Sequence, residues 1–414
     1  MTLAIVGLGH IGLPTAALLA KAGHQVVGVD TATAVVDAVN GGRSPMDEPG
    51  LDALIADLVA AGTLSAQTVM PEASVFLIAV PTPVSPSHEP DLSYVESAAE
   101  SVAERLKPGD LVILESTVPP GTTTGVVRER LEAQGLKAGI DFDLAFCPER
   151  VLPGSVLDEL VANDRTVGGL TPAGSARAAE LYRSFCMGAI HVTDPTTAEV
   201  AKLSENTFRD VNIALANELA QMASQLNVDA WQVIELANRH PRVHLHSPGP
   251  GVGGHCVPVD PWFLVAAAPQ SANLIRMARE INDAQPAVVA AHVARMTGTE
   301  AKVALLGAAY KPNVDDARES PTLGVALALE ALGIVPVVHD PKVQSFARPL
   351  VTLEEALTGA DAVVLLVGHH SYAELDPAWA GPLMRVRRVL DTQHLLDPAA
   401  WRNQGFEVQV LGTP

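Results

Sequence analysis

The first 30 residues alternate apolar runs with turn residues in the order strand, turn, helix, strand. Residues 3–6 are apolar and lead into a glycine-rich turn, and residues 13–22 then predict a helix that Gly23 closes. A second apolar run at 25–30 predicts the next strand. Two strands joined by one helix over this length are typical of a βαβ unit with parallel strands.

Further apolar runs repeat the same alternation as far as residue 146. They predict strands at 75–80, 111–114 and 143–146 and a helix at 94–106. Strands without a polar face are buried on both sides, as in a parallel sheet that is covered by helices. The pattern therefore predicts a doubly wound α/β domain over residues 1–193.

The pattern changes at Asp194, which precedes a proline in the first helical position. Neither glycine nor a further proline follows until after residue 226, so one long helix is predicted over 194–226. A polar stripe shares one face of this helix, and apolar residues lie between its members. The stripe is Lys202, Asn206, Arg209 and Asn212, and the apolar residues, which we expect to be buried, are Leu203, Phe208, Val211, Ile213 and Leu215. Such a stripe lines a cleft or forms an ordinary solvated face.

Strand and helix patterns resume in the C-terminal third. Strands are predicted at 302–307, 335–340 and 361–367 and a helix at 323–332, without a complete G-x-G-x-x-G motif. The predicted fold is α/β, with two Rossmann-like doubly wound domains joined by a long central helix. The predicted domains are residues 1–193, a helical domain 194–296 that contains the Pro/Gly-rich loop 247–256, and residues 297–414.

Composition restricts the class of partner and the compartment. The chain has 414 residues, 47 acidic and 27 basic, so its net charge is −20, and 48% of its residues are hydrophobic. This excludes a disordered chain and argues against a nucleic acid or an anionic membrane as partner. The apolar segment 3–20 lacks a basic flank and contains Pro14, so we expect neither a signal peptide nor a membrane span. Three cysteines without C-x-x-C spacing indicate neither a disulfide scaffold nor structural zinc, and we expect a cytoplasmic protein.

Gly7, Gly9 and Gly12 form a G-x-G-x-x-G motif between a predicted strand and a predicted helix. The first glycine permits a tight turn, the second lets a pyrophosphate approach the backbone, and the third lets the helix pack closely. Asp30 ends the next strand, where a carboxylate binds ribose hydroxyls and repels a 2′-phosphate. The motif therefore predicts NAD rather than NADP as cofactor; the alternative is a tight structural turn.

Cys256 is the candidate nucleophile, because two glycines and His255 precede it in a predicted loop. Cys147 and Cys186 have apolar neighbours and are expected in the core. Beside an NAD site, a thiolate at position 256 would add to an aldehyde, and hydride loss would then give a thioester. The histidine-rich segment 240–246 could bind a metal, but Pro241 breaks its register and no carboxylate is interleaved, so we predict no metal.

Six motifs in order resemble those of the nucleotide-sugar 6-dehydrogenases, over essentially the whole chain. They are Gly7–Pro14, Val80–Pro83, Glu115–Thr117, Cys147–Arg150, Gly253–Cys256 and Asp316–Pro321. The resemblance implies an N-terminal NAD domain, a central helix that forms a homodimer and a C-terminal UDP-binding domain. It also implies that the C6 alcohol of a UDP-sugar is oxidised twice, to a carboxylate, by two NAD molecules in turn.

The resemblance assigns roles residue by residue. The catalytic set is Cys256 as nucleophile, Lys202 and Asn206 around the C6 oxygen, Asp260 as the group that orients water or accepts a proton, and Thr117 and Glu149 in the same network. The cofactor set is Gly7, Gly9, His10, Ile11, Gly12, Asp30, Pro81, Thr82, Thr117 and Arg318. The substrate set is Glu149, Arg150, Val151, Lys202, Asn206, Arg209, His240, Arg242, Gly253, Tyr310 and Lys311.

Six further segments resemble the branch that oxidises UDP-N-acetyl-D-mannosamine. They are His88–Asp91, Tyr94–Ser97, Val151–Gly154, Asn163–Arg165, Arg209–Ile213 and Asn238–Arg242. The first alternative is another sugar of the same class, UDP-N-acetylglucosamine or UDP-glucose, although UDP-glucose enzymes usually carry Ser at His255 and Lys at Val259. The others are a two-electron hydroxyacid-type dehydrogenase and a non-catalytic sensor of NAD or a nucleotide sugar. A role in polysaccharide biosynthesis or in secondary metabolism stays open, as does an oligomer larger than a dimer.

Overall fold

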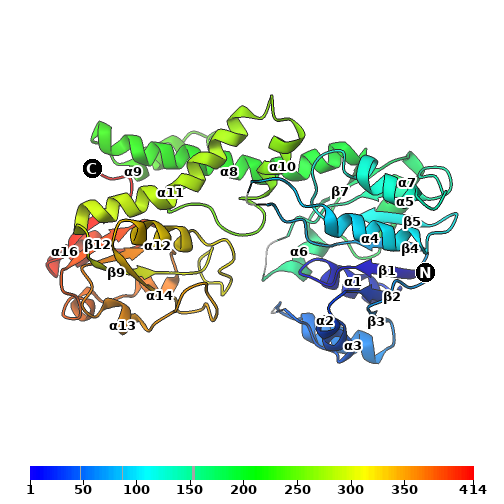
Figure 1. Cartoon of the computed structure of the whole chain (residues 1–414), viewed down its shortest axis with the longest axis horizontal. Coiled ribbons are helices and arrows are strands. Elements are labelled where there is room, and N and C mark those ends of the chain that lie inside the picture. Colours follow the sequence, from blue (N-terminus) through cyan, green and yellow to red (C-terminus); the bar gives the residue numbers. More distant parts are fainter. Residues whose placement is uncertain (47, 86, 152–153) are drawn as a thin grey trace. The chain divides into compact units, whose positions relative to one another are not determined.

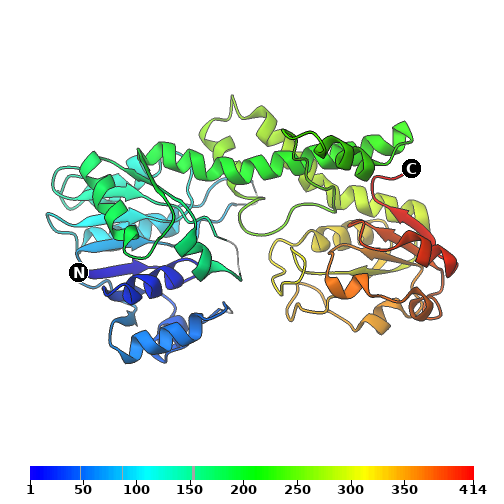
Figure 2. The ribbon, with the colours of Figure 1, turned by 180° about the vertical axis from the view of Figure 1, so that it is seen from behind.

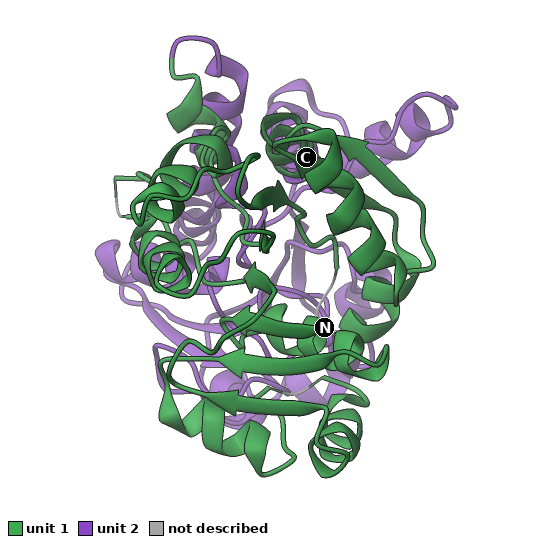
Figure 3. Cartoon of the chain, turned by 90° about the vertical axis from the view of Figure 1, so that its right-hand side faces the viewer, with its two compact units in different colours: residues 1–205, 262–269 green, residues 206–261, 270–414 purple. Residues whose placement is uncertain are grey.

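The computed structural model describes residues 1–46, 48–85, 87–151 and 154–414, so two positions of the Val151–Gly154 segment lie outside the described residues. The chain forms two compact units (Figure 3). The first unit contains residues 1–205 and 262–269, and the second contains residues 206–261 and 270–414. The division into three domains stays a prediction.

The first unit is built on an eight-stranded sheet (Figure 1). Its strands are β1 (Thr2–Val6), β2 (Gln25–Val29), β3 (Leu64–Gln67), β4 (Val75–Ile78), β5 (Leu111–Leu114), β6 (Asp143–Phe146), β7 (Arg165–Gly169) and β8 (Ile190–Thr193). The order is β3-β2-β1-β4-β5-β6-β7-β8, and all neighbours are parallel except β6 and β7. The first six strands have the Rossmann order, with the reversal between β1 and β4.

Helices cover both faces of this sheet, as the apolar strands predict. They are α1 (Gly12–Lys21), α2 (Thr33–Asn40), α3 (Leu51–Ala60), α4 (Ser93–Ala103), the π-helix η1 (Thr123–Val127), α5 (Arg128–Glu132), α6 (Val156–Ala162) and α7 (Pro172–Arg183). Leu3 and Ile5 of β1 pack in the apolar cluster that contains α1, whereas Ala4 and Val6 pack in the cluster that contains α4. Successive side chains of one strand thus enter two cores, which is the doubly wound arrangement.

The second unit contains a smaller, five-stranded parallel sheet. Its strands are β9 (Lys302–Leu306), β10 (Val335–His339), β11 (Ala362–Leu365), β12 (Arg388–Asp391) and β13 (Glu407–Val410). The order is β10-β9-β11-β12-β13, with β13 at one edge (Figure 2). The helices are α9 (Ala230–Asn238), α11 (Asn273–Thr297), α12 (Pro321–Ala331), α13 (Leu353–Leu357), α14 (His370–Ala373), α15 (Pro377–Ala380) and α16 (Pro398–Asn403). The predicted α/β fold with two doubly wound sheets is confirmed.

The predicted long helix is confirmed as α8 (Pro195–Leu226), which is continuous across the boundary between the two units. Helix α10 (Asp260–Ala267) crosses the second boundary. The expected burial of the apolar residues along α8 is only partly correct. Leu203 is fully buried, but Phe208 is 61% exposed and Leu215 is 45% exposed. Helical spacing identifies an apolar face without saying whether the same chain covers it. Among the described helices, none is long and apolar enough to cross a membrane.

A buried ion pair joins α8 to α11 inside the second unit. The Arg279 guanidinium donates to Asp210 Oδ1 at 2.5 Å, and the two side chains are 1% and 0% exposed. Asn282 Nδ2 donates to the same carboxylate oxygen at 2.9 Å and to the Asp210 carbonyl oxygen at 3.0 Å. Because charges in such a place cannot be hydrated, each partner depends on the other.

Replacement of Arg279 by Ala is therefore expected to leave an uncompensated buried carboxylate. The expected loss is about 3–5 kcal/mol in the free energy of unfolding, measured by urea denaturation with tryptophan fluorescence. Arg239→Ala is the matched control, since this arginine is 75% exposed in its pair with Glu235; its loss should stay below about 1 kcal/mol. Equal losses for the two variants would contradict the assignment.

Candidate active site

The turn between β1 and α1 requires glycine at two positions, because a Cβ atom there would clash with main-chain carbonyl oxygens. Gly7 has φ +92°, and a Cβ there would lie 2.4 Å from the carbonyl oxygen of Ala79. A Cβ on Gly12 would lie 1.9 Å from the carbonyl oxygen of Gly7. Apart from Gly9 itself and its chain neighbours, no described atom lies within 4 Å of a Cβ built on Gly9, so the backbone there is open to a ligand. These three environments match the three roles of a dinucleotide-binding turn.

Asp30 follows β2 directly and is held in place by main-chain donors. Its Oδ2 accepts a hydrogen bond from the N–H of Leu8, and its Oδ1 accepts one from the N–H of Ala32, both at 2.9 Å. The first bond ties the carboxylate to the glycine turn itself. The remaining lone pairs of a fixed carboxylate can accept hydrogen bonds from a ribose.

A cavity of about 580 Å³ lies at this turn in the first unit. Six residues of the predicted cofactor set line it: Gly7, Gly9, His10, Ile11, Asp30 and Pro81. Thr82 instead donates through its hydroxyl to the carbonyl oxygen of Thr117 at 2.6 Å, so these two predicted residues touch. An open glycine backbone, a helix N-terminus and a fixed carboxylate around one cavity fit a dinucleotide.

Sequence reasoning missed the wall of the cavity that α4 and the following residues supply. This wall consists of Tyr94, Ser97, Ala98, Ser101, Glu104 and Arg105. Most of these positions are three or four residues apart, which places them on one face of a helix. This spacing was the signal that could have identified the wall from the sequence. Thr68, Val69 and Met70, which follow β3, also line the cavity and carry no sequence motif.

The first unit brings two predicted catalytic residues together. Lys202 Nζ of α8 lies 3.3 Å from Glu149 Oε1, and their side chains are 6% and 12% exposed. The other carboxylate oxygen of Glu149 accepts a hydrogen bond from the N–H of Val151 at 2.9 Å. Arg150, predicted for the substrate, pairs with Glu205 at 2.5 Å. The lysine and the carboxylate thus form a largely buried ion pair, which fits the predicted shared site.

The second unit brings together three further predicted residues. Asn206 Nδ2 donates to Asp260 Oδ2 at 2.5 Å, and these residues are 1% and 3% exposed. The Arg209 guanidinium donates to Asn206 Oδ1. Asp260 also closes a turn with the predicted nucleophile, because its N–H donates to the carbonyl oxygen of Cys256 at 2.8 Å.

Cys256 is exposed, whereas Cys147 and Cys186 are buried as expected. The two glycines that precede its neighbour His255 lie against Tyr310: a Cβ on Gly254 would lie 3.0 Å from the tyrosine ring, and one on Gly253 would lie 3.0 Å from the tyrosine Cβ. Burial raises the pKa of Tyr310, and the nearby negative charges of Asp316 and Cys256 raise it further. The phenol is therefore neutral beside the thiol.

The remaining predicted residues lie on the surface of the second unit. Three of them, His240, Arg242 and Lys311, are exposed, and Arg318 pairs with Asp316 at 2.6 Å. The segment that carries His240 is held by amide side chains: Asn212 Nδ2 donates to the His244 carbonyl oxygen at 2.8 Å. The described residues contain no group of His, Cys, Asp or Glu side chains that could hold a metal ion.

Three family models match consecutive segments of the chain. The NAD binding domain of the UDP-glucose/GDP-mannose dehydrogenase family matches residues 1–186, its central domain matches 196–284, and its UDP binding domain matches 304–398. The chain belongs to the UDP-glucose/GDP-mannose dehydrogenase family. Membership in this family makes it an NAD-dependent nucleotide-sugar dehydrogenase, and NAD is its cofactor.

Relatives and solved structures cover nearly the full length. The UDP-N-acetyl-D-mannosamine dehydrogenase of Escherichia coli (strain K12) is 48% identical over 90% of this chain and 94% of its own. The NDP-N-acetyl-D-galactosaminuronic acid dehydrogenase of Ralstonia nicotianae is 47% identical over 95% of each chain. The structure of the UDP-D-ManNAc dehydrogenase from Pyrococcus horikoshii has a TM-score of 0.92 at 41% identity, covering 100% of this chain and 99% of that one.

Asp30→Ala is expected to weaken NADH binding at least tenfold, because it removes the predicted ribose acceptor and the bond to Leu8. The dissociation constant is measured by NADH fluorescence titration. Asp37→Ala on α2, where the carboxylate is exposed, is the matched control and should bind NADH like the unaltered protein. Unchanged affinity in the Asp30 variant would remove the ribose role from this residue.

Proposed function

We propose that the protein oxidises the C6 hydroxyl of UDP-N-acetyl-D-mannosamine to the carboxylate, in two NAD-dependent steps through a thioester on Cys256. The observation that carries this proposal is the setting of Cys256, an exposed thiol whose preceding loop has no side chains at Gly253 and Gly254. A reactive thiol needs substrate access more than it needs burial. The expected cytoplasmic location stays a prediction.

In the first oxidation the substrate alcohol loses a proton and a hydride. NAD supplies the hydride acceptor for this step and for the second one. Lys202 stabilises the developing negative charge on the C6 oxygen, and Asn206 donates an amide hydrogen to the same oxygen. Asp260 or Glu149 takes the proton, since each already contacts one of these two groups. The product is the C6 aldehyde.

In the second oxidation the Cys256 thiolate attacks the aldehyde carbon and forms a carbon–sulfur bond. The resulting alkoxide is stabilised as before, and loss of a second hydride converts the thiohemiacetal to a thioester. Water held by Thr117, Glu149 and Asp260 then adds to the thioester carbon, and the thiolate leaves. One alcohol, two oxidised cofactors and one water become one carboxylate, two reduced cofactors and three protons.

The choice of sugar is supported by the segments that resemble the N-acetylmannosamine branch and by the relatives named for that substrate. Arg209, His240, Arg242 and Lys311 are proposed to bind the sugar and the diphosphate. The relative from Ralstonia nicotianae is named for an N-acetylgalactosaminuronic acid and is almost as similar, which favours an N-acetyl sugar as the shared feature. UDP-N-acetylglucosamine and UDP-glucose are the other candidates.

Two NADH per sugar are expected with UDP-N-acetyl-D-mannosamine, measured by absorbance against the sugar consumed. UDP-N-acetylglucosamine, UDP-N-acetylgalactosamine and UDP-glucose are assayed in parallel under the same conditions. The substrate assignment fails if one of these three gives the higher kcat/KM. One NADH per sugar would contradict the thioester route.

Cys256→Ser is expected to lower the overall rate by about three orders of magnitude or more, because an alcohol is a far weaker nucleophile than a thiolate. The aldehyde stage should then accumulate and react with an added hydrazine. Cys186→Ser, at a buried thiol, is the control and should retain turnover. Full activity in the Cys256 variant would show that another group is the nucleophile.

We also propose that α8 forms a homodimer. Four apolar side chains of α8 from position 208 onward are exposed, at spacings of seven, seven and four residues: Phe208, Leu215, Met222 and Leu226. They are 61%, 45%, 49% and 63% exposed. Apolar residues at heptad spacing form one stripe of a helix, and such a stripe is typical of a helix–helix interface.

Leu215→Asp is expected to convert a particle of twice 43.3 kDa to a monomer in size-exclusion chromatography with light scattering, since a charge in an apolar interface is not hydrated. Met187→Asp, at a position that is 87% exposed in the first unit, is the control and should leave the mass unchanged. A monomeric unaltered protein would refute the dimer.

A further inference from the structure

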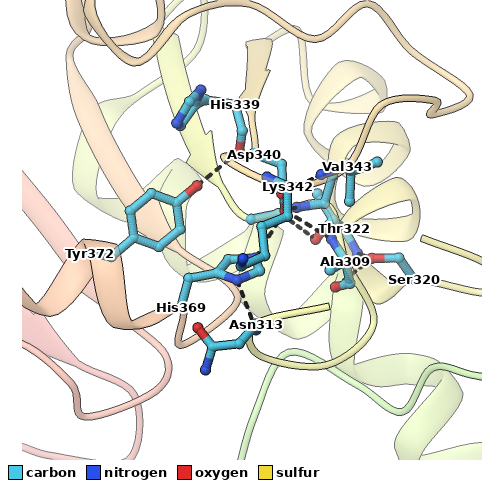
Figure 4. A network of polar contacts seen from close by, with 12 residues as sticks. Ala309, Asn313, Ser320, Thr322, His339, Asp340, Lys342, Val343, His369 and Tyr372 are labelled. Carbon is cyan, nitrogen blue, oxygen red and sulfur yellow. Dashed lines mark hydrogen bonds and ion pairs between the residues drawn. The ribbon is translucent and has the colours of Figure 1, made fainter. Parts of the chain in front are cut away.

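The sheet of the second unit has its reversal of strand order between β9 and β11. The neighbours of β9 on the two sides are β10 and β11, so the loops after β9 and β11 leave the same edge on opposite sides of the reversal. Ligands of such sheets bind outside this edge. Residues 307–313 follow β9, and residues 366–369 follow β11. Asp340, which follows β10, and His369, which follows β11, form a buried pair that is hydrogen-bonded to the loop after β9 (Figure 4).

Asp340 follows β10 and uses both carboxylate oxygens internally. Oδ2 accepts hydrogen bonds from the N–H groups of Ala308 at 2.6 Å and Ala309 at 3.0 Å. Oδ1 accepts hydrogen bonds from the N–H groups of Lys342 at 2.8 Å and Val343 at 2.9 Å. The carboxylate therefore fixes the start of the loop after β9.

His369 supplies a fifth hydrogen bond to Asp340 and fixes the end of the same loop. Its Nδ1 accepts from the main-chain N–H of Asn313 at 2.9 Å, so this nitrogen carries no hydrogen. The hydrogen is on Nε2, which donates to Asp340 Oδ2 at 3.0 Å. Although burial alone would raise the pKa of Asp340, the bond from His369 and the main-chain bonds hold this pKa well below its usual range.

The two anchors hold a short segment whose end is conformationally unusual. Asn313 has φ +64°, in the left-handed region that costs a side-chain-bearing residue energy. Its side-chain oxygen accepts a hydrogen bond from the N–H of His370 at 3.0 Å. Tyr310 and Lys311, both in the proposed substrate set, lie between the anchors. Their placement thus depends on Asp340 and His369.

Tyr310 links the position of the 308–313 segment to the loop that precedes Cys256. Its ring and Cβ occupy the space that side chains at positions 253 and 254 would need, three and two residues before Cys256. The main-chain N–H of Tyr310 donates to the carbonyl oxygen of Asp316 at 2.9 Å, which fixes the tyrosine from its other side. A shift of the 308–313 segment would therefore move groups on both the substrate side and the thiol side.

The equivalent acid of the first unit is used differently. Asp30 also follows the second strand of its sheet and also accepts from the loop after the first strand. It makes two such main-chain bonds and lines the cofactor cavity. Asp340 makes four main-chain bonds and a fifth hydrogen bond with the His369 side chain, and its own side chain is 0% exposed. The same position serves ligand binding in one sheet and loop placement in the other.

We propose that Asp340 and His369 are positioning residues for the nucleotide-sugar site, acting through the 308–313 segment and not through contact with the substrate. The inference depends on the proposed function only for the identity of the sugar. The nucleotide part is supported separately, because a UDP binding domain matches this part of the chain. The pair sets the affinity for the nucleotide sugar and leaves NAD binding untouched.

Two substitutions at position 369 separate the two hydrogen bonds of the ring. His369→Gln places a donor near Nε2 and keeps the bond to Asp340, but loses the acceptor for Asn313. His369→Asn places an acceptor near Nδ1 and keeps the anchor at Asn313, but loses the bond to Asp340. His370→Gln, at the exposed neighbouring histidine, is the matched control. Asp340→Asn is the second test, because an amide cannot accept at both positions.

His369→Gln is expected to raise the dissociation constant of UDP, measured by calorimetry, and the KM for the UDP-sugar about tenfold. His369→Asn should stay within about threefold and His370→Gln unchanged, and Asp340→Asn should resemble His369→Gln. The dissociation constant of NADH should be the same in all four. A merely structural role would instead lower thermal stability and weaken NADH and UDP together, and that result overturns the proposal.

The proposal would also be overturned if the His369→Gln and Asp340→Asn variants were folded and bound UDP with unchanged affinity. Failure of the proposed function is distinguishable, because the unaltered protein would then not oxidise UDP-N-acetyl-D-mannosamine. The UDP titrations would still decide whether the pair positions the nucleotide site.

Discussion

The loops of this protein depend on one constraint: main-chain N–H groups beyond the carboxyl ends of the strands have no strand partner and must be bonded elsewhere. Aspartates at strand ends accept hydrogen bonds from these N–H groups. Asp30 follows β2, Asp340 follows β10, and Asp391 ends β12. Asp391, fully buried, accepts from the N–H groups of Gln393, Leu395 and Leu396. Each carboxylate satisfies donors that would otherwise be unpaired and so fixes the path of a loop, and some candidate site residues, such as Gly9 and Tyr310, lie on such loops.

This use of carboxylates changes the meaning of the net charge of −20. Part of the acidic excess lies inside the molecule and holds backbone in place, so it does not describe the surface alone. Three cations of the candidate site are also paired with carboxylates: Lys202 with Glu149, Arg150 with Glu205, and Arg318 with Asp316. At the glycine turn we expect an anionic cofactor to meet main-chain N–H groups and a helix N-terminus, which attract a pyrophosphate without a formal charge.

Local patterns predicted the elements whose causes are local. The apolar strands, the glycine turn and the long helix α8 follow from residue type and spacing, and the structure contains them. The antiparallel pairing of β7 with β6 was not predicted, because pairing direction depends on the connection and not on composition. The exposure of Phe208 and Leu215 was missed because periodicity does not say what covers a face. His369 was missed for another reason: its partners are 29 and 56 residues away, and no motif marks it.

The different use of Asp30 and Asp340 has a consequence for protein design. Two sheets of similar construction need not offer similar ligand sites, because a carboxylate that is saturated by its own backbone has no capacity left for a ribose. An engineer who wished to place a second dinucleotide on the five-stranded sheet would first have to provide other acceptors for four main-chain N–H groups. Before the Asp340 carboxylate could bind a ligand, the loops that now depend on it would have to be redesigned.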